Sequence, residues 1–267
     1  MSTPPTILVF DSGLGGLTVY REVAKARPDA RFIYAADDAF FPYGRHGEPA
    51  LVARVLKVMD EWIAAYRPDL VVIACNTAST LVLPQLRARF QVPFVGTVPA
   101  IKPACAGSKS KLVSVLGTEA TVSREYTRAL IRDFAEGCAV TLIGSPRLAE
   151  LAEAALKGEA VTDEAIAAEL APCFVDADGA RTDTVVLACT HYPLLLDRFQ
   201  KLAPWPVNFI DPAPAIARRV TALLGLAAPG SAAPPGRAIF SSGQAPSPAL
   251  APALGRYGLE AGIAANV

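Results

Sequence analysis

The chain has 267 residues, 52% of them hydrophobic, which excludes intrinsic disorder over most of its length and allows one large or two modest cores. Its 25 basic residues balance 25 acidic ones without a basic run, so we expect neither nucleic acid nor a membrane surface as a partner. No apolar run approaches the roughly 20 residues that span a bilayer, and MSTPPTILVF lacks the features of a secretory signal, so we expect a cytoplasmic protein with a small-molecule partner.

Short runs rich in β-branched residues alternate with longer helical patterns along the chain. We expect buried strands at TILVF (6–10), RFIYAA (31–36), LVVIAC (70–75), PFVGT (93–97), KLVSVL (111–116), AVTLIG (139–144), TVVLAC (184–189) and VNFI (207–210). The stretch ALVARVLKVMDEWIAAY (50–66) has the apolar spacing of a helix with one buried face. Strands separated by helices predict an α/β fold with doubly wound parallel sheets.

The composition changes after Leu226, where LAAPGSAAPPG is typical of an Ala/Pro/Gly linker. A possible strand, RAIFSS (237–242), and a short helix near residues 250–257 follow. A disordered tail is the alternative. We predict that this strand and helix dock back onto the body of the protein.

Two pairs of similar segments indicate an internal duplication. VVIACNTAST (71–80) resembles VVLACTHYPL (185–194), and ILVFDSGLGGLTVYREV (7–23) resembles LVSVLGTEATVSREYTRAL (112–130). Both pairs occur in the same order and at similar separations. Each half therefore repeats two strand–turn–helix units.

We predict two pseudo-symmetric lobes with the active site in the cleft between them. One lobe comprises residues 1–97 plus 209–267, and the other comprises residues 98–208. Pseudo-twofold symmetry would place equivalent strand ends on opposite sides of one ligand.

Cys75 and Cys189 each follow a predicted strand and precede a predicted helix. Ligands of open α/β sheets bind at the carboxyl ends of strands, and the electropositive start of a helix favours a thiolate. Polar residues that suit a carboxylate follow both cysteines: Asn76, Thr77, Thr190 and His191. A single cysteine at a strand end is more often a buried small hydrophobe, but the duplicated context favours a function.

Two thiols on opposite sides of a carbon atom predict a stereoinversion. One removes a proton from a carbon centre and the other delivers a proton to the opposite face. Asp11 ends the first predicted strand and could assist Cys75, although it could equally shape a turn or cap a helix. Ser12 could donate to a ligand or only shape the same turn. His191 lies two residues after Cys189, whereas we assign His46 a solvated or structural role.

The remaining features argue against metal and nucleotide sites. The five cysteines include no CxxC pair, and with two histidines they offer no cluster for zinc, so we predict no metal site. An odd number of cysteines fits free thiols in a reducing compartment. Cys105, Cys138 and Cys173 lack polar surroundings, and we expect them to be structural. The DSGLGGLT loop has Thr18 where a dinucleotide fingerprint needs glycine.

Four motifs together resemble glutamate racemases of the cofactor-independent aspartate/glutamate racemase superfamily. They are DSGLGG (11–16), PYG (42–44), CNTAS (75–79) and ACTHYP (188–193). The resemblance runs from about Ile7 to Leu224 and more loosely through IFSSGQ. The Thr-His form of the last motif points to glutamate rather than aspartate as the substrate.

The resemblance implies a role for each matched residue. Cys75 acts on D-glutamate with the help of Asp11, and Cys189 acts on L-glutamate with the help of His191, which Glu153 of SPRLAELAE supports. The implied substrate contacts are Asp11, Ser12, Tyr43, Gly44, Asn76, Thr77, Thr190 and His191. The resemblance also implies catalysis without a cofactor, a homodimer, and D-glutamate supplied to peptidoglycan synthesis. Gln244 stands where many relatives carry an acidic residue.

Three other functions remain open on the sequence. A Cys-His hydrolase or amidotransferase would need a single nucleophilic thiol. A two-lobed α/β protein can also bind an amino acid or dicarboxylate without reacting. Aspartate, hydantoin or maleate chemistry on the same scaffold is the third.

Overall fold

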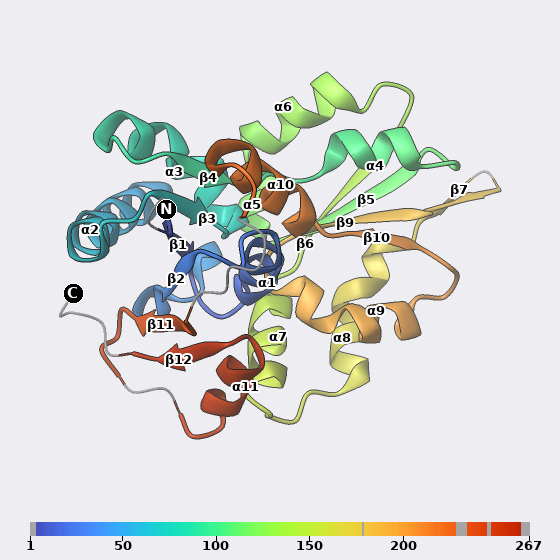
Figure 1. Ribbon diagram of the computed structural model, residues 1–267. Coiled ribbons are helices and arrows are strands. Elements are labelled where there is room, and N and C mark those ends of the chain that lie inside the picture. Colours follow the sequence, from blue (N-terminus) through green and yellow to red (C-terminus); the bar gives the residue numbers. More distant parts are fainter. Residues whose placement is uncertain (1–3, 178, 228–233, 245–246, 263–267) are drawn as a thin grey trace. The chain divides into compact units, whose positions relative to one another are not determined.

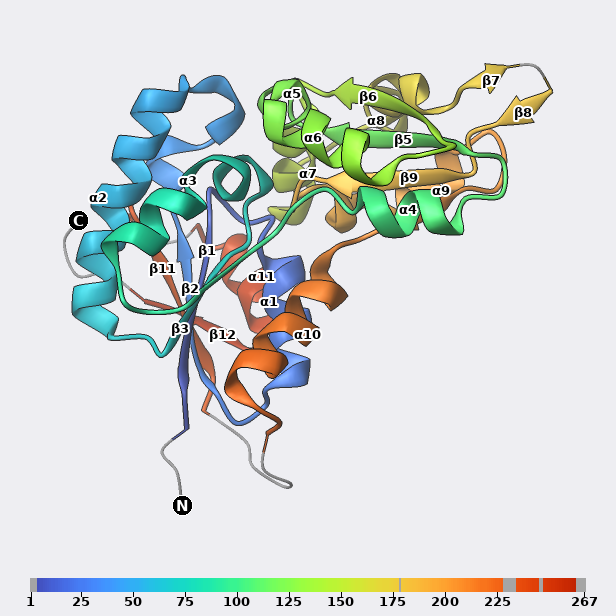
Figure 2. The same ribbon diagram turned by 90° about the horizontal axis from the view of Figure 1, so that it is seen from above.

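A computed structural model describes residues 4–177, 179–227, 234–244 and 247–262 (Figures 1 and 2). The chain forms two compact units. The first comprises residues 1–97 and 213–267, and the second comprises residues 98–212. Among the described residues, no helix is both long and apolar enough to cross a membrane.

The first unit contains a six-stranded sheet in which all pairs are parallel. Its strand order is β12-β11-β2-β1-β3-β4. The strands are β1 (Thr6–Asp11), β2 (Arg31–Ala36), β3 (Leu70–Ile73), β4 (Phe94–Gly96), β11 (Gly236–Phe240) and β12 (Leu259–Ala261). The central strands β1 and β3 are almost wholly buried, as expected for a sheet that is covered on both faces.

Helices cover both faces of this sheet (Figure 2). The helices α2 (Glu48–Tyr66) and α3 (Asn76–Arg89) pack on one face, where Trp62 and Val82 join a core with Phe10 and Ile73. The other face carries α1 (Leu17–Ala26) and α10 (Ala213–Leu224), which pack against each other. Two short 3-10 helices, η1 (Asp38–Phe40) and η2 (Tyr43–Arg45), connect β2 to α2.

The second unit contains a four-stranded parallel sheet with the order β10-β9-β5-β6. The strands are β5 (Leu112–Gly117), β6 (Ala139–Gly144), β9 (Thr184–Ala188) and β10 (Asn208–Ile210). A short antiparallel hairpin, β7 (Asp176–Ala177) and β8 (Ala180–Arg181), lies apart from this sheet.

Two hydrophobic clusters cover the two faces of the second sheet. One lies beneath α4 (Ile101–Gly107) and α6 (Glu125–Phe134). The other lies beneath α7 (Leu148–Leu156), α8 (Asp163–Leu170), η4 (Tyr192–Leu195) and α9 (Leu196–Leu202). The remaining elements are α5 (Glu119–Ser123) and η3 (Ala171–Cys173).

The same strand order occurs in both units. The order β2-β1-β3-β4 in the first sheet corresponds to β6-β5-β9-β10 in the second. The paired segments of the sequence therefore take equivalent places, with Cys75 after β3 and Cys189 after β9. The first sheet alone is extended, by β11 and β12.

The predicted α/β fold with parallel sheets is confirmed, and each predicted strand overlaps an observed one. The predicted strands 70–75 and 184–189 are too long, because β3 ends at Ile73 and β9 ends at Ala188, which leaves both cysteines in the turns that follow. The second unit includes the whole of β10, which a boundary after residue 208 would divide.

The C-terminal segment returns to the first sheet. β11 pairs with β2, and α11 (Leu250–Arg256) precedes β12, which pairs with β11. This agrees with the predicted strand and helix, although the sequence reading missed β12. Residues 228–233 of the predicted linker lie outside the described residues.

Candidate active site

The carboxyl ends of three neighbouring strands place the candidate residues of the first unit along one edge of the sheet. Asp11 is the last residue of β1, Asp37 follows β2, and Cys75 follows β3. Backbone hydrogen bonds hold these ends in register, since the N–H of Asp37 donates to the carbonyl of Asp11 at 2.9 Å and the N–H of Ala74 donates to the carbonyl of Phe10 at 2.8 Å. This edge is where open parallel sheets bind ligands.

Cys75 lies at the start of α3, where its backbone is extended and no side chain caps the helix. Its Sγ lies 3.7 Å from the hydroxyl of Ser12, so the two predicted residues meet in the structure. Only 4% of Cys75 is exposed. The helix start provides partial positive charge and backbone N–H groups, which favour a thiolate and an anionic ligand.

Asn76 carries polar atoms that the fold leaves without partners. Neither the amide oxygen nor the amide nitrogen has a hydrogen-bond partner among the described residues, although the side chain is buried. Buried polar groups are almost always paired, so this amide is suited to bind a ligand beside Cys75. Thr77 is buried directly after it.

Asp11 is fully buried, and one carboxylate oxygen accepts a hydrogen bond from the N–H of Gly13 at 3.1 Å. The turn-shaping role considered for this residue is therefore present. Gly16 packs directly against it, because a Cβ at Gly16 would lie 2.6 Å from the Cβ of Asp11. The glycine-rich loop thus serves close packing around the carboxylate.

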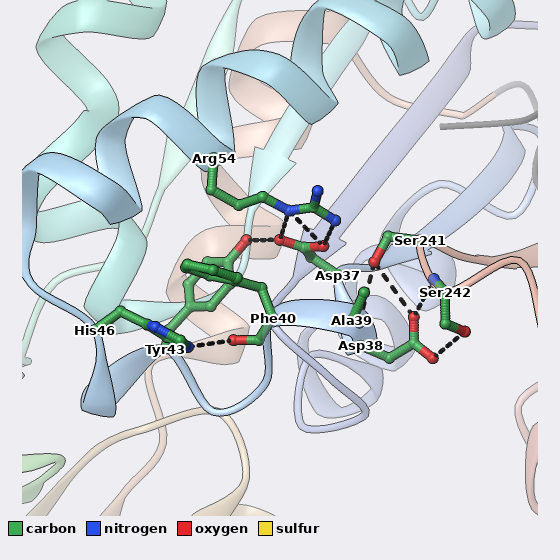
Figure 3. A network of polar contacts seen from close by, with 9 residues as sticks. All are labelled: Asp37, Asp38, Ala39, Phe40, Tyr43, His46, Arg54, Ser241 and Ser242. Atoms are coloured by element: carbon green, nitrogen blue, oxygen red, sulfur yellow. Dashed lines mark hydrogen bonds and ion pairs between the residues drawn. The ribbon is translucent and has the colours of Figure 1, made fainter.

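Tyr43 and Gly44 lie in η2, in the connection that follows Asp37 (Figure 3). The Tyr43 side chain is buried, and its hydroxyl donates to the Asp37 carboxylate at 2.6 Å. Burial and the neighbouring Asp37 carboxylate hold the pKa of Tyr43 well above its ordinary value. This hydroxyl therefore stays protonated, and its proton is directed to Asp37.

The second unit brings together three of its predicted residues. The Sγ of Cys189 lies 3.8 Å from Nδ1 of His191, and Nε2 of His191 lies 2.9 Å from a Glu153 oxygen on α7. The other Glu153 oxygen accepts from Lys157 at 3.0 Å. These contacts form a buried chain that ends at a half-exposed lysine. Thr190, which separates the cysteine from the histidine in the sequence, is also buried.

Glu153 remains ionised within this series of contacts. Burial alone would raise the pKa of its carboxyl group, but the hydrogen bond with His191 and the charges of His191 and Lys157 outweigh it and lower the pKa to about 2. A carboxylate on Nε2 holds the imidazole in one orientation and directs Nδ1 towards the thiol. His191 is thereby placed to exchange a proton with Cys189.

The other three cysteines differ from this pair. Cys105 and Cys173 lie in hydrophobic clusters of the second unit, where burial raises the pKa of the Cys105 thiol to about 11 and that of Cys173 to about 12. Cys138 is half-buried and donates to the carbonyl of Cys105. Buried thiols with raised pKa values, such as those of Cys105 and Cys173, are unreactive, as expected for structural cysteines. The described residues contain no group of three or more potential metal ligands.

Comparison with known proteins identifies the family. A family described as Asp/Glu/Hydantoin racemase matches residues 7–220. This chain belongs to the Asp/Glu/Hydantoin racemase family. It is therefore an isomerase, and the racemase chemistry that the resemblance implied is confirmed at the level of the family.

Relatives of this racemase are similar over most of its length. A glutamate racemase from Brucella canis is 58% identical over 219 residues, which cover 82% of this chain and 79% of the relative. The crystal structure of Escherichia coli glutamate racemase in complex with L-glutamate and the activator UDP-MurNAc-ala is 43% identical, with a TM-score of 0.87 over 97% of both chains. Glutamate racemase isoform RacE1 from Bacillus anthracis is 25% identical, with a TM-score of 0.79 over 100% of both chains.

The sequence reading missed a buried carboxylate of the racemase's first unit and its partly buried arginine partner. Asp37 is fully buried at the end of β2, and Arg54 of α2 donates to both of its oxygens from Nε, at 3.1 and 3.0 Å. The rule that selected Asp11, a carboxylate at the carboxyl end of a buried strand, would also have selected Asp37. Its pairing with Arg54 had no signal in the sequence, because only the packing of α2 on the sheet brings them together.

Proposed function

We propose that the chain is a glutamate racemase that interconverts L- and D-glutamate by proton transfer between two thiols and the α-carbon. The observation that carries this proposal is the placement of Cys75 and Cys189 at equivalent strand ends, each beside a group that can assist it. The high identity with glutamate racemases over most of the chain supports glutamate as the substrate.

In the proposed reaction Cys75 acts on D-glutamate. Its thiolate removes the α-proton with the help of Asp11, and the thiol of Cys189 delivers its own proton to the opposite face of the carbanion. In the reverse direction the Cys189 thiolate removes the proton from L-glutamate with the help of His191 and Glu153. After one turnover from D-glutamate, Cys75 carries the proton taken from the substrate and Cys189 is left as a thiolate, so the two cysteines have exchanged the roles of base and acid. The mechanism requires that one glutamate molecule reaches both thiols.

The substrate carboxylates and amine are proposed to contact the polar groups around both cysteines. These groups are Asp11, Ser12, Tyr43, Gly44, Asn76, Thr77, Thr190 and His191. The side-chain amide of Asn76, which has no partner among the described residues, and the N-terminus of α3, which has no side-chain cap, support this assignment for the first unit. Aimed N–H donors would also stabilise the negative charge that develops in the transition state, without a cofactor. D-Glutamate would supply peptidoglycan synthesis in the cytoplasm, and we propose a homodimer.

Proton NMR of the purified enzyme with L-glutamate in deuterium oxide, without pyridoxal phosphate, tests the function. We expect the α-proton signal to disappear while D-glutamate accumulates on a chiral column. If the signal persists although glutamate binds, the chain is a binding protein or an enzyme that acts on another acid. Parallel assays with aspartate and hydantoins would distinguish these two possibilities.

Two variants test the assignment of the thiols. C189A should not racemise but should still exchange the α-proton of D-glutamate in deuterium oxide. Cys75 can remove this proton and return a solvent deuteron to the same face. C75A should show the opposite behaviour with L-glutamate. Normal turnover of either variant would contradict the two-thiol mechanism and would favour a hydrolase or amidotransferase with a single nucleophile.

A further inference from the structure

Asp37 is a buried charge of the first unit whose two carboxylate oxygens both accept hydrogen bonds. Its carboxylate accepts from the Tyr43 hydroxyl and from the guanidinium of Arg54, which supplies both Nε and a terminal nitrogen (Figure 3). Asp37 is fully buried, and the Arg54 side chain is 18% exposed. A buried carboxylate is costly unless it is paired in this way, so the geometry of all three residues is fixed together.

The contact to Tyr43 determines the position of η2. The Tyr43 ring lies in the same hydrophobic cluster as Cys75, and η2 packs against α3, the helix that Cys75 begins. Gly44 lies in the middle of this 3-10 helix, where the N–H of Arg45 donates to the carbonyl of Pro42 and the N–H of His46 donates to the carbonyl of Tyr43, both at 3.2 Å. Asp37 is therefore linked through Tyr43 to an element that packs beside Cys75.

The neighbouring carboxylate anchors the other side of the same connection. Asp38 accepts from the N–H and the hydroxyl of Ser242 at 2.9 and 2.7 Å, and from the hydroxyl of Ser241. Ser241 also accepts from the N–H of Ala39. Asp37 thus contacts η2 through Tyr43, whereas Asp38 contacts the turn after β11 (Figure 3).

We propose that Asp37 is a positioning residue for substrate binding. It holds the Tyr43 hydroxyl and so keeps η2, which carries the proposed substrate contact Gly44, beside α3 and the substrate bound at Cys75. Arg54 acts through Asp37, because its planar fork fixes the orientation of the carboxylate that Tyr43 requires. This inference rests on the proposed glutamate racemase function. In it, the Tyr43 side chain holds η2 in place and the backbone of η2 contacts the substrate.

The test compares two variants that each remove one hydroxyl group. Y43F deletes the hydrogen bond to Asp37 and keeps the buried ring, whereas S242A deletes the matching bond to Asp38 on the far side. We expect Y43F to raise KM for both enantiomers about tenfold, the loss typical of one hydrogen bond to a charged group, with kcat changed less than about threefold. S242A should leave KM within about twofold.

Hydrogen–deuterium exchange provides a readout that does not depend on turnover. We expect faster amide exchange over residues 41–46 in Y43F, and in S242A only over residues 38–39 and 240–244. Unchanged KM together with unchanged exchange in Y43F would overturn the inference. Equal effects of both variants on KM would also overturn it, because they would reflect general loosening of the connection.

The same design separates this inference from the proposed function. A wild-type enzyme that does not racemise glutamate would refute the function. The exchange data would then show whether Asp37 holds η2, and unchanged exchange in Y43F would refute the positioning role as well.

Discussion

At the scale of single residues, the two candidate thiols have different partners. Cys75 lies beside the hydroxyl of Ser12, near a strand end that carries Asp11, whereas Cys189 lies beside an imidazole that a carboxylate holds. A hydroxyl can only orient a thiol, but an imidazole can also exchange a proton with it at neutral pH. We therefore expect the two half-reactions to respond differently to substitutions around each cysteine.

Replacing Glu153 tests the support of His191. E153Q keeps the shape of the side chain but removes the charge that fixes the imidazole. In metal sites, removal of a group that supports a histidine in this way lowers activity by about 10- to 100-fold. We expect kcat to fall by a similar factor. In a C75A background, E153Q should also slow exchange of the α-proton of L-glutamate, whereas in a C189A background it should leave exchange with D-glutamate unchanged. Equal slowing in both backgrounds would contradict a role through Cys189.

The lowered pKa of Glu153 also predicts a pH dependence of stability. The pKa is depressed from 4.5 to about 2 in the folded state, so its contribution is complete above pH 4.5 and is lost as the pH falls towards 2. Between pH 6 and pH 3 the wild type should lose about 2 kcal/mol more unfolding free energy than E153Q. Urea unfolding of both proteins at the two pH values measures this difference. Parallel losses would show that Glu153 is not the titrating group.

Gly16 offers a matched test of the packing around Asp11. In G16A the new Cβ would lie 2.6 Å from the Cβ of Asp11 and 3.0 Å from the Tyr34 hydroxyl, so the strand end must shift. We expect a loss of about 1–3 kcal/mol in stability, typical of overpacking, and a larger loss of kcat/KM. G47A is the control, because nothing lies within 4 Å of its Cβ. Thermal unfolding compares the stability of the two variants, and turnover assays compare their kcat/KM.

At the scale of elements, α3 begins with a residue that does not stabilise the start of a helix. Cys75 occupies the N-cap position with extended backbone, yet it makes no capping hydrogen bond. Serine is among the preferred residues at this position, because its hydroxyl accepts from the first free N–H groups of the helix. A helix start that lacks a cap keeps its N–H groups available for a ligand, at some cost in stability.

This feature predicts opposite effects of one substitution on stability and activity. C75S should be more stable than C75A by about 0.5–2 kcal/mol, because serine can cap α3 and alanine cannot. Both variants should lose racemisation, because a serine hydroxyl is a far weaker acid than a thiol. Chemical unfolding and turnover assays measure the two effects. A C75S variant no more stable than C75A would indicate that ligand-free α3 gains nothing from a cap.

The elements differ in how far the sequence predicts them. The central strands could be found because both faces are buried and the chain is continuously apolar, as in LVVI and TVVLA. β12 was missed because LEA carries a charged residue and is only partly buried. The helix expected over the second copy of the repeat is broken between α5 and α6 at Arg124, whose extended backbone gave no sequence signal.

The candidate site was predictable where its residues follow the ends of predicted strands or lie in the duplicated motifs. Ser12 near Cys75 and His191 near Cys189 could be inferred from strand ends and duplicated motifs. The link from Glu153 to His191 came only from the family resemblance, and the link from Asp37 to Arg54 was missed. Such contacts depend on how a helix packs on the sheet, which composition and spacing do not determine.

At the scale of the whole molecule, the two units are built differently from the same strand order. The second unit is continuous from residue 98 to 212, whereas the first is completed by the C-terminal residues 213–267. These residues supply α10, which covers α1, and β11, which covers the edge of β2. The first unit therefore depends on the last part of the chain, and the second does not.

This difference predicts that the second unit folds alone. Both of its hydrophobic clusters consist of residues between 98 and 212, so its cores are complete without the rest of the chain. A fragment of residues 98–212 should unfold cooperatively in urea, with the circular dichroism of an α/β protein. A fragment of residues 1–97 should aggregate, because without β11 the backbone edge of β2 is exposed, and adding residues 213–267 should restore solubility. A non-cooperative transition of the 98–212 fragment would show instead that the second unit requires the first in order to fold.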